Sequence, residues 1–152
     1  MTSARTRSRD IRVRAADGRE LTRDQVERLA AAVERGFTAA DLRSIEEVAA
    51  EHLLEHSESL GHTDFRERVE MIRTILADPT LSVDEIVAQG NIVVWRWHIA
   101  GTHEGKWMGF APTGKQVTLP GISVDRFENG RSVEHWEFPD LVELASQLES
   151  RA

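Results

Sequence analysis

The chain has 152 residues, the length of one domain with a single hydrophobic core. Its formal net charge is −7, and such an acidic surface repels phosphate backbones, so no nucleic-acid partner is expected. It has no cysteine, which excludes disulfides, thiol catalysis and thiolate metal sites. No apolar run approaches the roughly 18 residues of a membrane span, and none follows the N-terminal arginines as in a secretory signal. We therefore expect a cytoplasmic protein with no membrane partner.

A basic segment precedes the patterned part of the chain. Residues 1–19 are polar and rich in arginine, and their apolar residues show no periodicity. We predict a flexible basic arm over residues 1–19 and one domain over residues 20–152. A basic arm could contact an anionic partner, but a solvated tail is the simpler interpretation.

Helical periodicity dominates the first half of this domain. Thr22 is a suitable N-cap for a first helix, and Thr38 for a second. A third helix is expected to end at the Asp78–Pro79 pair, because the residue before proline disfavours helical backbone angles. The apolar spacing predicts these three helices over residues 22–36, 38–52 and about 63–78.

The pattern changes near residue 81 to segments rich in Val, Ile, Trp and Phe that are separated by turns. Four long antiparallel strands are predicted, over residues 81–88, 91–103, 115–127 and 131–138. The Asn129–Gly130 pair between the last two is a strong hairpin signal, and a short helix follows Asp140. Helices followed by antiparallel strands are typical of an α+β domain with its helices on one face of the sheet.

The strand region also carries a series of short motifs. In chain order they are Gly101-Thr102-His103-Glu104-Gly105, Pro112-Thr113-Gly114, Gly121-Ile122, Arg126-Phe127, Asn129-Gly130-Arg131 and Glu134-His135-Trp136. Together they resemble the SnoaL-like family of polyketide cyclases and ester cyclases, within the nuclear-transport-factor-2-like superfamily. The resemblance implies a cone in which N-terminal helices pack on a curved antiparallel sheet around a small-molecule cavity. It also implies a homodimer.

One predicted strand alternates tryptophan with chemically active residues. Because side chains alternate between the faces of a strand, Arg96 and His98 share one face, and Trp95 and Trp97 share the other. Similarity to distantly related limonene-epoxide hydrolases, which carry an Arg-x-Asp pair on the comparable strand, implies that Arg96 and His98 face the cavity. The two tryptophans would then form an aromatic dimer interface. The structural alternatives are an ion pair for Arg96 and a hydrogen-bonded buried histidine for His98.

The resemblance also implies a general acid/base. In the aromatic polyketide cyclases an aspartate follows the stretch matched by Glu134-His135-Trp136, and Glu137 occupies that position in this chain. An apolar cavity would raise the pKa of such a carboxyl, which suits proton transfer near neutrality. Those cyclases pair the acid with a histidine at the position of Ser123, so the expected pair is broken and His98 or His135 would have to substitute. Asp125 lies two residues after Ser123 and therefore on the same face of the predicted strand. It either faces inward, faces solvent or pairs with Arg96.

A glycine-hinged loop and one histidine complete the candidate site. Trp107, Met108 and Phe110 suit a lid over an apolar ligand, or alternatively plug the end of the sheet. His56 corresponds to a cavity histidine of many family members. It lies four residues after His52, but nothing marks a third ligand, so we predict no metal site.

These features predict a cofactor-independent polyketide cyclase of secondary metabolism, which closes a ring in a polyketide-like substrate. Glu137 would act as general acid/base, and Arg96 and His98 would stabilise enolate charge. The predicted substrate-binding residues are His56, Trp107, Met108, Phe110, Ser123, Asp125 and His135. The alternatives are a hydroxylase or hydrolase of a polycyclic substrate, and a non-catalytic binding or assembly module, which the missing histidine favours.

Overall fold

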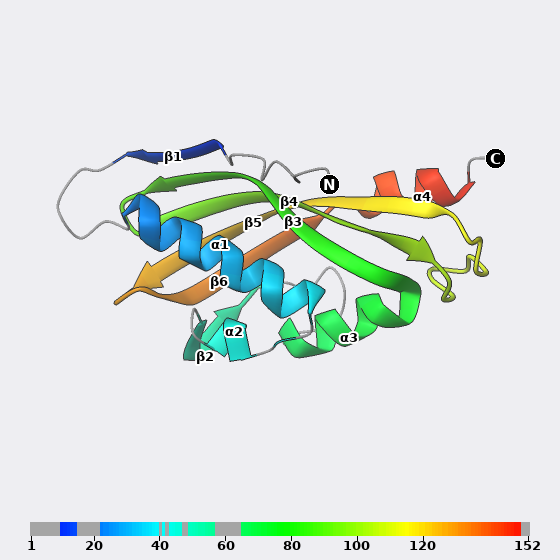
Figure 1. Cartoon of the computed structure of the whole chain (residues 1–152), viewed down its shortest axis with the longest axis horizontal. Helices are drawn as coiled ribbons and strands as arrows, with labels where there is room; N and C mark the ends of the chain where they lie inside the picture. Colours follow the sequence, from blue (N-terminus) through cyan, green and yellow to red (C-terminus); the bar gives the residue numbers. More distant parts are fainter. Residues whose placement is uncertain are drawn as a thin grey trace, which may run out of the picture.

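The computed structural model describes residues 10–14, 22–39, 41, 43–46, 49–56 and 65–149 (Figure 1). Its strands are β1 (Asp10–Arg14), β2 (Ala49–Glu55), β3 (Leu76–Gln89), β4 (Ile92–His103), β5 (Gln116–Glu128) and β6 (Arg131–Pro139). Its helices are α1 (Arg23–Thr38), α2 (Arg43–Glu46), α3 (Phe65–Ile75) and α4 (Leu141–Glu149). None of these described helices is long and apolar enough to cross a bilayer.

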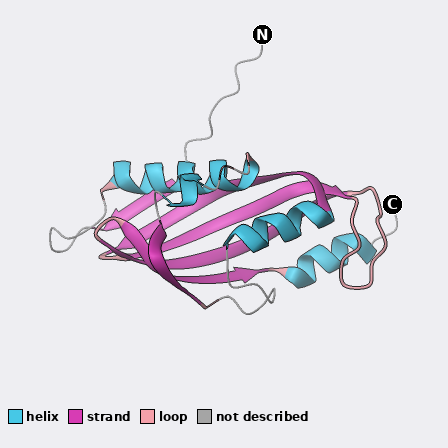
Figure 2. Ribbon diagram, turned by 90° about the horizontal axis from the view of Figure 1, so that it is seen from below, coloured by secondary structure: helices cyan, strands magenta, loops and turns pink. Residues whose placement is uncertain are grey.

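The strands form one six-stranded sheet in the order β1-β3-β4-β5-β6-β2. The four central strands, β3 to β6, pair antiparallel as the sequence predicts. The sheet is mixed rather than purely antiparallel, because the edge strands β1 and β2 pair parallel with β3 and β6. The sheet curves around α1 and α3, which lie across the same face of the strands (Figures 1 and 2). The α+β prediction is confirmed.

The core lies between these helices and the concave face of the sheet. Amphipathic α1 begins with a capping box, in which Thr22 Oγ1 accepts from the Gln25 amide and the Gln25 side chain accepts from the Thr22 amide. It buries Val26 and Leu29 against the sheet. Along β4 and β5 the odd-numbered residues point inward, so period-two alternation decides which side chains reach the interior.

The second predicted helix is wrong over most of its length. Of that segment, α2 covers only Arg43–Glu46, and Ala49–Glu55 form β2 instead. The edge of β6 has backbone groups free to pair with another strand, and the local apolar pattern of this segment carries no information about that pairing. For example, the His56 amide just after β2 donates to the His135 carbonyl at 2.9 Å. Tertiary pairing therefore overrides the local helical periodicity.

Two other segments differ from the sequence prediction. Residues 10–14 of the predicted arm form β1, while the rest of that arm lies outside the described residues. The third helix ends at Ile75, and the Asp78–Pro79 pair lies within β3 at an irregularity of the β3–β4 register. Asp78 has a φ of 47°, and the strand accommodates the pair in a bulge just after it begins.

The loop between β4 and β5 docks on the C-terminal end of α3. The backbone amides of Glu104 and Gly105 donate to the Ile75 carbonyl at 3.0 and 2.9 Å, respectively. A Cβ atom at Gly105 would lie 1.8 Å from the backbone oxygen of Thr74. Only glycine fits at this close approach of two backbones.

We expect Gly105→Ala to lower the free energy of unfolding by about 2–4 kcal/mol, because the clash is with rigid backbone. Gly114→Ala is the matched control in the same loop. Gly114 has a φ of 68° with no atom within 4 Å of an added Cβ, so that change should cost only about 1–2 kcal/mol of backbone strain. Urea denaturation measures both values, and equal losses would contradict the packing argument.

Candidate active site

A cavity lies between the helical layer and the concave face of the sheet. It is bounded by α1, β2 and α3 on one side and by β3, β4, β5 and β6 on the other. Its volume is about 80 Å³, counted as the space that the centre of a water molecule can reach. One water needs about 10–15 Å³ on this measure, so the cavity is large enough for a small ligand. The walls are mainly apolar, and their ionisable groups are Glu55, Arg68, Asp125, His135 and Glu137.

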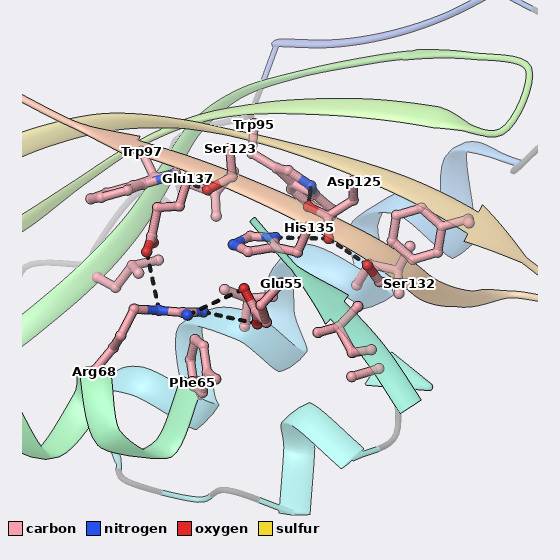
Figure 3. Close-up of a pocket in the computed structure, with 17 residues that line it drawn as sticks. Glu55, Phe65, Arg68, Trp95, Trp97, Ser123, Asp125, Ser132, His135 and Glu137 are labelled. Atoms are coloured by element: carbon pink, nitrogen blue, oxygen red, sulfur yellow. Dashed lines mark hydrogen bonds and ion pairs between the residues drawn. The ribbon is translucent and has the colours of Figure 1, made fainter. Parts of the chain in front are cut away.

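A histidine–aspartate pair stands on the sheet side of this cavity (Figure 3). His135 on β6 and Asp125 on β5 are directly opposite in the antiparallel register, and His135 Nδ1 lies 3.0 Å from Asp125 Oδ1. The same carboxylate accepts hydrogen bonds from Trp95 Nε1 at 2.7 Å and from Ser132 Oγ at 2.6 Å. Three donors from two strands, β4 and β6, therefore hold Asp125 in one orientation.

The electrostatics of His135 follow from this arrangement. Burial favours the neutral imidazole, but the charge and hydrogen bond of Asp125 outweigh it, with help from Glu137 and Glu55, so the pKa of His135 is raised above 6.5. With Nδ1–H donating to Asp125, the neutral ring carries its lone pair on Nε2. No described protein group hydrogen-bonds to Nε2, which faces the open cavity (Figure 3). This atom is placed to take up or deliver a proton.

An ion-paired arginine forms the helical side of the cavity. Arg68 on α3 is only 4% exposed, and its guanidinium donates to both carboxylate oxygens of Glu55 on β2, each at 3.2 Å. Its Nε lies 3.1 Å from Glu137 Oε2 on β6. The Phe65 ring stacks beside the guanidinium, with its centroid 5.7 Å from Cζ. Arg68 thus ties α3 to two strands across the cavity.

The register explains the substitution at Ser123. Ser123 lies opposite Glu137, and Asp125, two residues later in β5, lies opposite His135, two residues earlier in β6. The pair that the family resemblance implies at positions 123 and 137 is therefore replaced by one at the neighbouring inward pair, with acid and histidine exchanged between strands. Ser123 instead accepts a hydrogen bond from Trp97 Nε1 at 2.9 Å. The sequence prediction that Ser123, Asp125, His135 and Glu137 face the cavity agrees with this geometry.

The predicted placement of Arg96 and His98 is wrong. They share one face of β4 as expected, but it is the outer face, where Arg96 pairs with Glu85 at 3.3 Å and His98 Nδ1 lies 2.9 Å from Asp84. Trp95 and Trp97 line the cavity, each 5% exposed, and so cannot form a dimer interface. Strand alternation tells which residues share a face of the strand, but not which of the two faces points to the interior. The two large indoles are buried because they remove more apolar surface from water.

The predicted lid does not cover the cavity. Trp107 is buried in the core, Phe110 packs against it with ring centroids 6.5 Å apart, and Met108 is 70% exposed. None of the three lines the cavity, and Trp107 belongs to the hydrophobic core instead. The loop is anchored at the end of α3, too far along the strands to reach His135.

His56 is also outside the cavity. Its ring stacks on Trp136 with centroids 4.5 Å apart, and its Nε2 lies 3.4 Å from Glu134. Trp136 and Glu134 alternate with the inward residues of β6, so this cluster lies on the other face. Because β2 is a strand, His52 and His56 do not share a helix face. The side chain of His52 lies outside the described residues.

Sequence reasoning missed Glu55 and Arg68. Arg68 carries a usable signal, since it falls on the apolar stripe of α3 beside Phe65, Val69 and Ile72. A charged residue on a buried stripe requires a buried partner. Glu55 gives no such signal, because it lies outside every helix and strand that the sequence predicts.

We expect Arg68→Met to lower the free energy of unfolding by about 3–5 kcal/mol, because it leaves two carboxylates in the cavity without their cation. Arg66→Met on the exposed side of the same helix should change it by no more than about 0.5 kcal/mol. Adding Glu55→Gln and Glu137→Gln to Arg68→Met should recover most of the loss. Denaturant unfolding measures all of these, and an unchanged midpoint for Arg68→Met would contradict the proposed role.

Several solved structures resemble this chain. TsrD from Streptomyces laurentii aligns with a TM-score of 0.76 and 22% identity, over 87% of this chain and 100% of that one. IdmH from Streptomyces antibioticus, a candidate polyketide cyclase, aligns with a TM-score of 0.71 and 27% identity, over 83% of this chain and 99% of that one. AclR from Streptomyces galilaeus, a candidate hydroxylase, aligns with a TM-score of 0.70 and 26% identity, over 84% of this chain and 88% of that one.

No curated protein matches the chain significantly in sequence. The family model of the SnoaL-like polyketide cyclases, in contrast, matches residues 15–148. That range includes the cavity, the helices over it and the strands that carry Asp125 and His135. With the fold, the cavity and the family match in agreement, the chain belongs to the SnoaL-like polyketide cyclase family.

Proposed function

We propose that this protein is a cofactor-independent acid–base catalyst that closes a ring in a polyketide-type substrate, with His135 as its general base. The single observation that carries the proposal is the buried Asp125–His135 pair, with Nε2 of the imidazole open to an apolar cavity. The family match and the likeness to IdmH support the reaction class.

His135 replaces Glu137 as the proposed proton carrier for a geometric reason. Glu137 Oε2 is engaged by Arg68 at 3.1 Å, and taking up a proton there would weaken a buried ion pair. His135 Nε2 has no competing protein partner among the described residues, and Asp125 orients the ring and stabilises the imidazolium form.

The proposed step moves one proton out and back. His135 Nε2 removes a proton from a carbon next to a substrate carbonyl, which leaves an enolate and an imidazolium paired with Asp125. The enolate carbon attacks a second carbonyl of the same molecule and forms the carbon–carbon bond of the ring. The imidazolium then returns its proton to the resulting alkoxide, so no external oxidant, reductant or cofactor is needed.

Hydroxylation is the second candidate, supported by the likeness to AclR. It would begin with the same deprotonation, and an external oxidant such as dioxygen would have to supply the oxygen atom. Hydrolysis of an epoxide is less well supported, because it needs two acids flanking a water. Asp125 accepts from three donors and Glu137 is held by Arg68, so neither carboxylate is free for that role.

Deuterium exchange tests the proposed base without knowledge of the natural substrate. We expect the protein to accelerate exchange of the methyl protons of 2-acetylnaphthalene, a planar aromatic ketone, in D₂O, and His135→Gln to lower the rate about 10²-fold or more. His98→Gln removes a histidine that is also paired with an aspartate, but on the outer face, and should leave the rate unchanged. NMR follows the exchange. Equal rates for wild type and His135→Gln would exclude His135 as the base, and no acceleration by any form would favour a binding module.

The same pair predicts a pH dependence. A general base must be neutral, so the exchange rate should rise with pH through a midpoint above 6.5, where His135 loses its proton. Asp125→Asn removes the charge that raises this pKa, so the midpoint should move to lower pH. Titration of the imidazole Cε1–H by NMR measures both midpoints, with the signal assigned from the spectrum of His135→Gln. A midpoint that stays in place in Asp125→Asn would contradict the assigned electrostatics.

A further inference from the structure

A second hollow lies beyond the cavity. Its volume is about 20 Å³ on the same measure, which is room for about one methyl-sized group. The two spaces share five lining residues, so they meet at a common wall made of Phe65, Arg68, Leu81, Trp97 and Glu137.

The strands place the hollow behind that wall. On β4 the cavity is lined by Trp95 and Trp97 and the hollow by Trp97 and Ile99. On β6 the cavity is lined by residues up to Glu137 and the hollow by Glu137 and Pro139. Both strands therefore run from the cavity, through the wall, into the hollow, and His135 stands on the cavity side.

The wall is closed by two contacts that cross the interior. One is the Arg68–Glu137 ion pair from α3 to β6. The other is the Trp97 indole, which lies over Gly121, where an added Cβ would come within 2.3 Å of the ring, and donates to Ser123. The indole is fixed by backbone and hydrogen bond. The Glu137 side chain, held by its ion pair with Arg68, is the other part of the wall.

The lining of the hollow differs from that of the cavity. Apart from Arg68 and Glu137 in the wall, every described residue that lines it is apolar, including Phe37, Ile72 and Leu119. An apolar space of this size takes an alkyl group and offers no hydrogen bond to a polar one.

We propose that this hollow is a latent subsite for an unbranched alkyl substituent of the ligand, and that Glu137, held by Arg68, closes it in the wild-type protein and so limits the length of substituent that the cavity accepts. The proposal rests on the proposed function, since it requires that the cavity binds a ligand. It assigns Glu137 a role in specificity in place of proton transfer.

A series of 4-n-alkylphenols tests the subsite by calorimetry. We expect wild-type affinity to increase with tail length and then to stop increasing, because the tail meets the wall. In Glu137→Ala the increase should continue for about two further carbons, at about fourfold in affinity per methylene. Arg68 keeps its two hydrogen bonds to Glu55 in this variant, so no buried charge is left alone.

Two controls separate bulk from charge. Glu137→Gln keeps the size of the side chain and should keep the wild-type limit. Ile99→Phe added to Glu137→Ala fills the hollow from β4 and should restore that limit, and thermal unfolding verifies that each variant folds. If affinity stops increasing at the same tail length in wild type and in Glu137→Ala, the subsite proposal is overturned and the proposed function is not. A limit that moves equally in Glu137→Gln would also overturn the subsite proposal, and failure of every form to bind any alkylphenol would overturn the proposed function as well.

Discussion

Arg68 holds the helical side of the cavity against the sheet. Its guanidinium is buried between Glu55 and Glu137, so one side chain connects α3, β2 and β6. A buried cation is tolerated only where its charge and its donors are both matched, and two carboxylates do so here. The arginine spans the interior between α3 and the two strands, and it lines the cavity. The wall of the space for a ligand therefore includes this ion-paired group.

The chemistry of the site depends on the Asp125–His135 pair of β5 and β6. Asp125 is fixed by donors from β4 and β6, and it in turn fixes the tautomer of His135. The rings of Trp95 and Trp97 are largely apolar, but each donates its indole N–H to a polar residue of β5. The cavity is therefore apolar where a ligand would pack and polar at one position where a proton can move. The cation of the cavity is already neutralised by its partners.

Much of this could be predicted from sequence, because strand signals are local. The four central strands and the hairpin at Asn129–Gly130 follow from β-branched and aromatic runs between turns, and the structure confirms them. Likewise, strand alternation placed Arg96 with His98, and Trp95 with Trp97. The predicted direction of that alternation rests on a likeness to distant relatives, and it is wrong. The relative apolar areas of Trp95 and Arg96 would have given the correct face.

The sequence by itself determined the α+β class, the central strands and the presence of ionisable residues at positions 123–137, since each depends on composition and spacing within a few residues. Only the tertiary structure decided that Ala49–Glu55 form a strand, that Arg68 is buried between two acids, and that Asp125 pairs with His135. Each of these is a contact between elements distant along the chain or across strands. Pairing register and burial, which local periodicity does not encode, determine such contacts.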